Sequence, residues 1–330
     1  MAKTEEKYKK VGAVVIGRNE GQRLITCLDS LTKQLSSIVY VDSGSTDASI
    51  SNAKARGVKT LSLDLSEPFT AARARNEGAY YLIKNFSGIE YIQFIDGDCE
   101  LHADWINKAL QFLVNNDEYS IVCGRLRERH PEASIYNRLM DIEWNTPTGE
   151  TKACGGIFLI RVTAFQAING FKKNLIAGEE PEMCLRIRKH GWKIYRLDSE
   201  MALHDAAMTK FSQWWTRCIR TGYAFSLGYS LHGQSDERFY LKETRSILLW
   251  GLFLPVLIIV LTSINPVWII LSIIYPLQII RLSIKRPDLK ENRLLWATGV
   301  VLGKIPEAIG LLRFIYNRLK NSKMNIIEYK

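Results

Sequence analysis

Short runs of β-branched residues alternate with longer amphipathic stretches over the first 125 residues of the chain. The short runs predict β-strands at 11–16, 38–41, 58–63, 91–95 and 120–123. The stretches 23–35 and 47–56 have the pattern of amphipathic helices. This β-α-β order predicts an α/β fold with a doubly wound, mostly parallel, Rossmann-like sheet. In such sheets, ligands bind beyond the carboxyl ends of the strands.

The pattern becomes mixed after residue 125. We expect further strands at 157–161 and 193–197 and a helix at 181–190. We expect five parts: a charged N-terminal tail (1–10), one catalytic domain (11–233), a linker (234–245), a membrane hairpin (246–280) and a basic membrane-associated segment (281–330). The N-terminal tail lacks the apolar segment of a secretory signal.

The stretch 246–280 contains no charged residue in 35 positions and is interrupted by Asn265-Pro266. One membrane crossing needs about 20 apolar residues, so the stretch predicts a transmembrane helical hairpin, with a buried core hairpin as the alternative. Basic residues flank its outer ends and none lies at the turn. By the positive-inside rule, we expect a multi-pass protein of the cell membrane whose catalytic domain is on the cytoplasmic side.

The segment 281–330 carries 11 basic and 4 acidic residues. Its apolar stretch 294–316 contains Lys304, Glu307 and Arg313, and each charge within a span costs roughly 2.5 to 3.5 kcal/mol. We therefore favour an amphipathic helix in the interface, with a third transmembrane helix as the alternative. The basic residues suit anionic lipid headgroups.

The position of the charged residues along the chain is more informative than the overall composition. The 330 residues have 47% hydrophobic content and a net charge of +10, which by itself allows a nucleic-acid partner. Most of that charge lies in 281–330, so we expect no nucleic acid to bind the main domain. Six scattered cysteines without metal-type spacing predict reduced core thiols.

The sharpest chemical motif is Asp96-Gly97-Asp98, at the end of the predicted strand 91–95. Residues i and i+2 of a strand point the same way, so both carboxylates are expected to face the cleft, although a solvated turn gives the same motif. Two carboxylates are hard oxygen ligands that could hold Mg²⁺ or Mn²⁺ against a diphosphate.

Polar residues also follow the first two strands. Asn19, Glu20 and Asp42 suit recognition of a base and ribose, whereas dinucleotide and Walker A fingerprints are missing from the sequence. Arg75, in the segment 71–76, is expected near a phosphate or on a solvated helix face. The segment 125–130 suits an anionic acceptor or a solvated loop.

These motifs, with the later segments 178–182 and 186–192, together resemble family 2 glycosyltransferases of the GT-A fold, of the membrane-anchored bacterial type. The resemblance covers about 11–233. It implies a metal-dependent, inverting hexosyltransferase that uses a nucleoside-diphosphate sugar, with a UDP-sugar favoured over a GDP-sugar, and Mn²⁺ or Mg²⁺. The expected acceptor is lipid-linked or a glycan, in cell-surface polysaccharide or glycolipid synthesis at the lipid bilayer.

The resemblance also implies roles for single residues. Asp42 corresponds to the base-binding aspartate, Asp96 to the carboxylate near ribose and metal, and Asp98 to the direct metal ligand, while His204 completes the metal site. The catalytic base corresponds to Glu180. Glu179 and Glu182 remain alternatives, because this chain has Glu where the family's pair has Asp.

Two other classes of protein share part of this pattern. Haloacid-dehalogenase-like phosphatases carry a D-x-D motif, but on their first strand, whereas here the motif follows the fourth predicted strand. A catalytically silent, membrane-anchored scaffold with a nucleotide-binding fold is the second alternative.

Overall fold

The computed structural model describes residues 10–67 and 69–320 in two compact units. The first unit comprises the chain up to Arg129 together with Glu143–Ala206. The second comprises His130–Ile142 and the chain from Ala207. Most of the expected N-terminal tail and the end of the basic segment lie outside the described residues. The expected boundaries at residues 233, 245 and 280 stay predictions.

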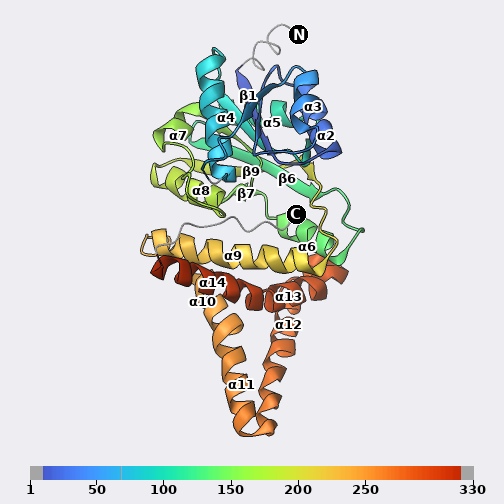
Figure 1. The fold of residues 1–330 in the computed structure, drawn as a ribbon, viewed down its shortest axis with the longest axis vertical. Helices are drawn as coiled ribbons and strands as arrows, with labels where there is room; N and C mark the ends of the chain where they lie inside the picture. The colour runs from blue at the N-terminus through green and yellow to red at the C-terminus, as the bar shows by residue number, and fades with distance from the viewer. Residues whose placement is uncertain (1–9, 68, 321–330) are drawn as a thin grey trace. The chain divides into compact units, whose positions relative to one another are not determined.

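The first unit contains a nine-stranded sheet with strand order β3-β2-β1-β4-β8-β6-β9-β5, and β7 pairs with β9 (Figure 1). The strands are β1 (Val11–Gly17), β2 (Ser37–Asp42), β3 (Lys59–Ser62), β4 (Tyr91–Asp96), β5 (Cys99–Leu101), β6 (Tyr119–Glu128), β7 (Gly149–Glu150), β8 (Phe158–Arg161) and β9 (Lys193–His204). The helices of this unit are α2 (Gln22–Thr32), α3 (Ser49–Ala55), α4 (Ala71–Asn85), α5 (Trp105–Asn115), α7 (Val162–Ala167) and α8 (Glu179–Lys189).

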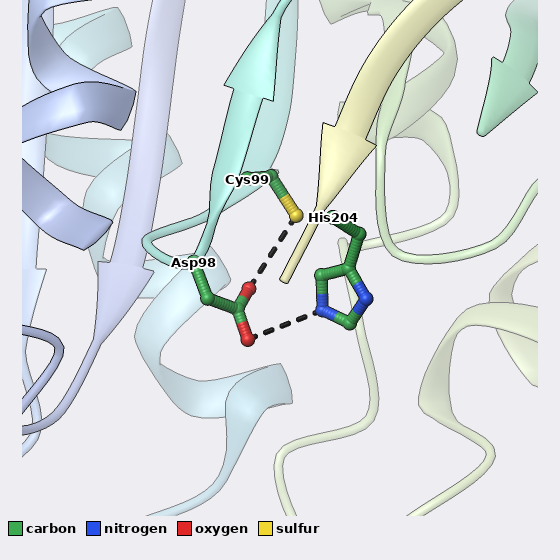
Figure 2. Close-up of side chains that lie close together, drawn as sticks. All are labelled: Asp98, Cys99 and His204. Atoms are coloured by element: carbon green, nitrogen blue, oxygen red, sulfur yellow. Dashed lines mark hydrogen bonds and ion pairs between the residues drawn. The ribbon is translucent and has the colours of Figure 1, made fainter. Parts of the chain in front are cut away.

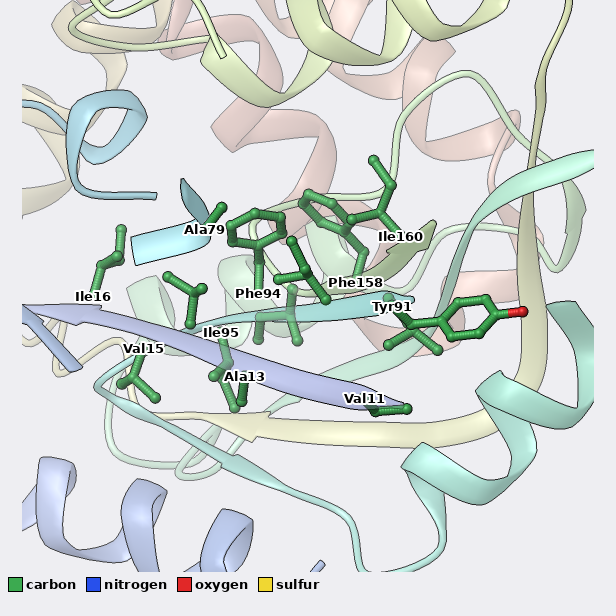
Figure 3. Close-up of a cluster of buried hydrophobic side chains, with 14 of the residues drawn as sticks. Val11, Ala13, Val15, Ile16, Ala79, Tyr91, Phe94, Ile95, Phe158 and Ile160 are labelled. Atoms are coloured by element: carbon green, nitrogen blue, oxygen red, sulfur yellow. The ribbon is translucent and has the colours of Figure 1, made fainter. Parts of the chain in front are cut away.

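The strands β3, β2, β1 and β4 run parallel, as the β-α-β order predicts. Their Val and Ile side chains are buried because helices cover both faces of a parallel sheet. Figure 3 shows this core where β1 and β4 meet β8. The rings of Phe94 and Phe158 lie 5.2 Å apart there, between centroids.

The other half of the sheet is mixed. β8 is antiparallel to β4 and β6, β6 is parallel to β9, and β5 is antiparallel to β9. The solvated-loop prediction for 125–130 is wrong over most of its length, because β6 continues to Glu128. The strand is not recognisable in the sequence because its end is highly charged. In the structure, Arg125 pairs with Asp198 and Glu200 on the neighbouring β9.

The second unit is helical. It contains most of α6 (Ile135–Trp144), α9 (Phe211–His232), α10 (Leu241–Ser246), the π-helical turns η1 (Ile247–Phe253), α11 (Leu254–Ile264), the 3₁₀ segment η2 (Pro266–Ile273), α12 (Ile274–Ile284), the 3₁₀ segment η3 (Pro287–Asn292), α13 (Arg293–Leu302) and α14 (Lys304–Leu319). The predicted hairpin is helical and turns at Asn265, whose side chain accepts a hydrogen bond from the Val267 N–H at 3.1 Å (Figure 1).

Three helical stretches of this unit are long and apolar enough to cross a membrane: Leu241–Ile264, Pro266–Ile284 and Pro287–Leu319. These helices are therefore compatible with membrane anchoring. Only 11% and 6% of the most apolar windows of the first two stretches are buried within the described protein. The alternative of a buried core hairpin is thus wrong within residues 10–67 and 69–320, which leave most of these side chains uncovered.

Close helix packing in this unit depends on glycine. A side chain at Gly222 of α9 would overlap the backbone carbonyl of Glu307 on α14. Conversely, a side chain at Gly310 of α14 would overlap the carbonyl of Ile219 on α9. The two helices approach closely because these positions lack a Cβ atom.

Candidate active site

Strand pairing brings Asp98 and His204 together. Asp98 lies in the turn between β4 and β5, and Cys99 at the start of β5 pairs with His204 at the end of β9. Asp98 Oδ2 lies 3.1 Å from His204 Nε2, and the Cys99 thiol donates to Asp98 Oδ1 at 3.4 Å (Figure 2). The three side chains each offer one donor atom, all within 4.8 Å of one another.

The protonation of His204 suits a ligand. Burial lowers the pKa of the imidazole, so the neutral ring is favoured. For one cation to bind both side chains, the lone pair of the neutral ring must lie on Nε2, the nitrogen 3.1 Å from Asp98 Oδ2. The proton then lies on Nδ1, a buried atom that has no hydrogen-bond partner among the described residues. Carboxylate oxygen and imidazole nitrogen together could hold a divalent cation such as Mn²⁺. Asp98 and His204 thus fit the predicted centre.

Asp96 lies outside that group of donors. Its Oδ1 accepts a hydrogen bond of 2.7 Å from Arg75, whose other terminal nitrogen donates to Glu179 Oε1 at 2.8 Å. Arg75 is 3% exposed, so the alternative of a solvated helix face is wrong for this residue. A Cβ at Gly156 would lie 2.8 Å from Asp96 Oδ2. The glycine therefore permits a backbone approach that a side chain would block.

Helix α8 presents three glutamates in its first turn, where the helix dipole favours negative charge. Glu180 Oε1 accepts hydrogen bonds from the Cys154 N–H at 2.7 Å and from the Cys154 and Cys184 thiols at 3.0 and 2.9 Å. Burial, the largest cause, raises the pKa of Glu180. Its Oε2 makes no hydrogen bond to the described residues.

Glu182 has a different environment. The side chain is 1% exposed and pairs with Lys172 at 3.0 Å and with Arg186 at 2.9 Å. A carboxylate held between two cations is suited to fixing the start of α8 against its surroundings. The two ion pairs therefore favour a structural role for Glu182 and leave Glu179 and Glu180 as the candidates for the base.

The predicted nucleotide-binding residues lie at the ends of β1 and β2. Asn19, at φ +56°, accepts a hydrogen bond from the Thr46 N–H at 2.8 Å. Asp42 is buried and accepts from the backbone N–H groups of Gly44 and Ser45 and from the Tyr40 hydroxyl. These bonds organise the loop that follows β2.

Glu20 pairs with Arg23 at 2.7 Å, within the turn and first residues of α2. Its carboxylate is thus held close to the carboxyl end of β1. A role for Glu20, Asn19 or Asp42 in binding a nucleotide stays a prediction.

Sequence reasoning missed the thiols of Cys154 and Cys184 as partners of Glu180. Cys184 lies four residues after Glu180, a spacing that places both on one helix face, whereas no sequence signal locates Cys154. It also missed Trp144, whose ring lies edge-on to His204 with 4.4 Å between centroids.

The mixed α/β sheet of the first unit has the GT-A fold, which is a fold of glycosyltransferases. Residues 13–174 match the model of glycosyl transferase family 2, and residues 140–210 match the model described as the N-terminal domain of galactosyltransferase. Residues 13–174 are thus a family 2 glycosyltransferase segment by that match.

Known proteins support this assignment. Glycosyltransferase AglE of Haloferax volcanii is 22% identical over 260 residues, which are 74% of this chain and 81% of that protein. Among solved structures, mannosyltransferase PcManGT from Pyrobaculum calidifontis, in complex with GDP-Man and Mn²⁺, is similar with a TM-score of 0.63 and 16% identity, over 92% of this chain and 87% of that one.

A second structural neighbour is glucosyl-3-phosphoglycerate synthase from Mycobacterium tuberculosis, in complex with Mn²⁺, UDP-glucose and glycerol 3-phosphate. The TM-score is 0.51 and the identity 14%, over 71% of this chain and 85% of that one. These similarities show the fold. The match of residues 13–174 to the glycosyl transferase family 2 model favours a glycosyltransferase over the dehalogenase-like phosphatase.

Proposed function

We propose that this protein transfers a sugar, with inversion, from a nucleoside-diphosphate sugar to a hydroxyl group of a lipid-linked or glycan acceptor at the membrane. The observation that carries the proposal is the β5–β9 pairing that places Asp98 and His204 side by side in a GT-A fold. The products belong to cell-surface polysaccharide or glycolipid synthesis. Structural neighbours in complex with Mn²⁺ and either GDP-Man or UDP-glucose support a nucleotide-sugar donor.

Asp98 and His204 would hold Mn²⁺ or Mg²⁺, with Asp96 beside them. When bound, such a cation supplies positive charge that stabilises the leaving diphosphate. Arg75 fixes the orientation of Asp96 through their 2.7 Å hydrogen bond. Glu179 in turn holds Arg75, so this chain of contacts connects the D-x-D motif to the start of α8.

Glu180 is our choice of catalytic base. Its Oε2 takes the proton of the acceptor hydroxyl while the hydroxyl oxygen attacks the anomeric carbon. The bond from that carbon to the diphosphate breaks on the opposite face, the diphosphate keeps the electron pair, and the configuration inverts. A pKa raised by burial supports the role, because a base is most effective when its pKa approaches the working pH.

At the other strand ends, Asp42, Asn19 and Glu20 would face the base and ribose of the donor. UDP is our first choice of nucleotide. The apolar helices support a membrane anchor, with both ends of the hairpin and the catalytic unit on the cytoplasmic side. We retain an interfacial helix, rather than a third crossing, for the last long apolar stretch.

The test is nucleoside-diphosphate release by the full-length protein with a panel of UDP- and GDP-sugars, Mn²⁺ or Mg²⁺, and a membrane extract as acceptor. We expect one donor to give release that a chelator abolishes and that D98A lacks. Asp104→Ala, at an exposed position before α5, is the matched control and should retain activity. Equal release by wild type and D98A would contradict the proposed centre, and cellular function retained by D98A would favour the silent scaffold.

A further inference from the structure

A second group of donor atoms surrounds the carboxylate of Glu180. Cys154 Sγ and Cys184 Sγ are 3.5 Å apart, and they lie 3.0 and 2.9 Å from Glu180 Oε1. The group is buried: Cys154 and Glu180 are each 6% exposed and Cys184 is 0% exposed. Neither Cys154 nor Cys184 forms a disulfide, so both sulfurs are available as ligands.

The spacing of these atoms is close to that around a tetrahedral cation. Bonds of about 2.3 Å to sulfur and about 2.0 Å to oxygen place neighbouring ligand atoms roughly 3.5 to 3.8 Å apart. The observed triangle needs to open by about 0.3 Å between the sulfurs and by about 0.5 to 0.6 Å between each sulfur and the oxygen. Two of its corners, Glu180 and Cys184, belong to one face of α8, which fixes them relative to each other.

The donor chemistry differs from that of the Asp98 centre. Two sulfurs and one oxygen favour a soft or borderline cation such as Zn²⁺ over Mn²⁺ or Mg²⁺. We propose that Cys154, Glu180 and Cys184 form an inhibitory site for Zn²⁺ or a similar thiol-seeking cation. Binding releases the two thiol protons and occupies the carboxylate that would otherwise accept the proton of the acceptor hydroxyl. The inhibitory effect rests on the proposed role of Glu180, whereas the binding does not.

Binding is tested first, without substrate. The reduced full-length protein is titrated with Co²⁺ as a spectroscopic probe and with Zn²⁺ against a chromophoric chelator. We expect a thiolate-to-cobalt charge-transfer band. C154S and C184S should weaken Zn²⁺ binding by at least about tenfold, since changing even an outer-shell partner of a metal ligand costs that much.

Cys99→Ser is the matched control, because Cys99 lies beside Asp98 in the other donor group. It should retain the band. A missing band, or a band lost only in C99S, would overturn the proposal. Because the serine variants could fold poorly, wild-type protein is also alkylated with and without Zn²⁺. Selective protection of Cys154 and Cys184, read by peptide mass spectrometry, supports the site, and equal alkylation overturns it.

Inhibition is tested second, with saturating Mn²⁺ and with each variant compared to its own activity without Zn²⁺. Zn²⁺ should inhibit wild type and Cys218→Ser, and a chelator selective for Zn²⁺ should restore activity. C184S should lose this sensitivity. Zn²⁺ bound at the thiols without inhibition would contradict the role of Glu180 while leaving the cation site intact, so the two failures are distinguishable.

Discussion

Asp98 and Glu180 are both buried carboxylates of the first unit, but their neighbours differ. Asp98 has the imidazole of His204 at 3.1 Å, and its position depends on the pairing of two strands. Glu180 has a backbone N–H and two thiols around a single oxygen, and its position depends on the first turn of a helix. The first arrangement suits a carboxylate that holds a cation together with an imidazole. The second suits a carboxylate that gains and loses a proton.

The largest expected effect is at Asp98. D98N keeps the shape of the side chain but removes its charge, and we expect kcat/KM to fall by about 10³-fold, which corresponds to several kcal/mol of lost transition-state stabilisation. The measurement is nucleotide release over a range of Mn²⁺ concentrations. Recovery of full activity at high Mn²⁺ would mean that Asp98 contributes only to Mn²⁺ affinity. The proposed catalytic contribution of the Asp98 centre would then be wrong.

The next effect is at Glu180. E180Q removes the base without changing the size of the side chain, and we expect kcat to fall by at least about 10²-fold, with Mn²⁺ affinity unchanged. Single-turnover kinetics with the accepted donor measure this step.

The comparison variant for E180Q is Glu182→Gln on the same helix. It breaks a buried ion pair with Arg186, so it should lower the free energy of unfolding by roughly 1–3 kcal/mol and leave kcat within a few-fold. A larger loss of kcat in E182Q than in E180Q would exchange the roles that we give to these residues.

A smaller effect is expected at Glu179. E179Q keeps a hydrogen-bond acceptor for Arg75 but removes the charge. We expect kcat/KM to fall by about tenfold, because Glu179 acts on Asp96 only through Arg75. The diagnostic result is its pH profile, whose acid limb should keep the wild-type form. If the acid limb disappears in E179Q and persists in E180Q, Glu179 is the base.

The smallest effect concerns the thiols. The base works when deprotonated, so activity should rise with pH through the pKa of Glu180, which burial places above its ordinary value. The Cys184 thiol opposes that shift by donating to the carboxylate. C184A should therefore raise the pKa of Glu180 further and move the acid limb to higher pH.

Cys218→Ala, in the second unit, is the control for this pH shift and should leave the limb in place. The measurement is kcat/KM between the acid limb and neutral pH. A shift of C184A to lower pH would show that the thiol does not stabilise the charged carboxylate.

The sequence predicted the parallel half of the sheet well, because strands such as β1 and β4 are buried on both faces and read as continuous apolar runs. It did not predict the full length of β6, whose arginines pair with carboxylates on β9 and so resemble a solvated loop. It also predicted the helical hairpin, because a long uncharged stretch is a property of sequence alone.

In the candidate site too, the features set by local sequence were predictable and those set by tertiary contacts were not. The D-x-D motif at a strand end could be recognised from local pattern, and the resemblance pointed to His204. Local pattern could not show that Arg75 is buried between Asp96 and Glu179, because these three residues are far apart in the chain. Nor could it show that Cys154 reaches Glu180 from a separate loop.

By itself, the sequence determined the class of sheet, the position of the acidic motif at a strand end and the apolar helices, because each depends on residues close together along the chain. Only the tertiary structure decided which carboxylates meet which partners. The antiparallel β5–β9 register sets Asp98 beside His204, and the packing of α8 against the Cys154 loop surrounds Glu180 with thiols. These contacts join distant segments, and their geometry depends on how the strands and helices pack.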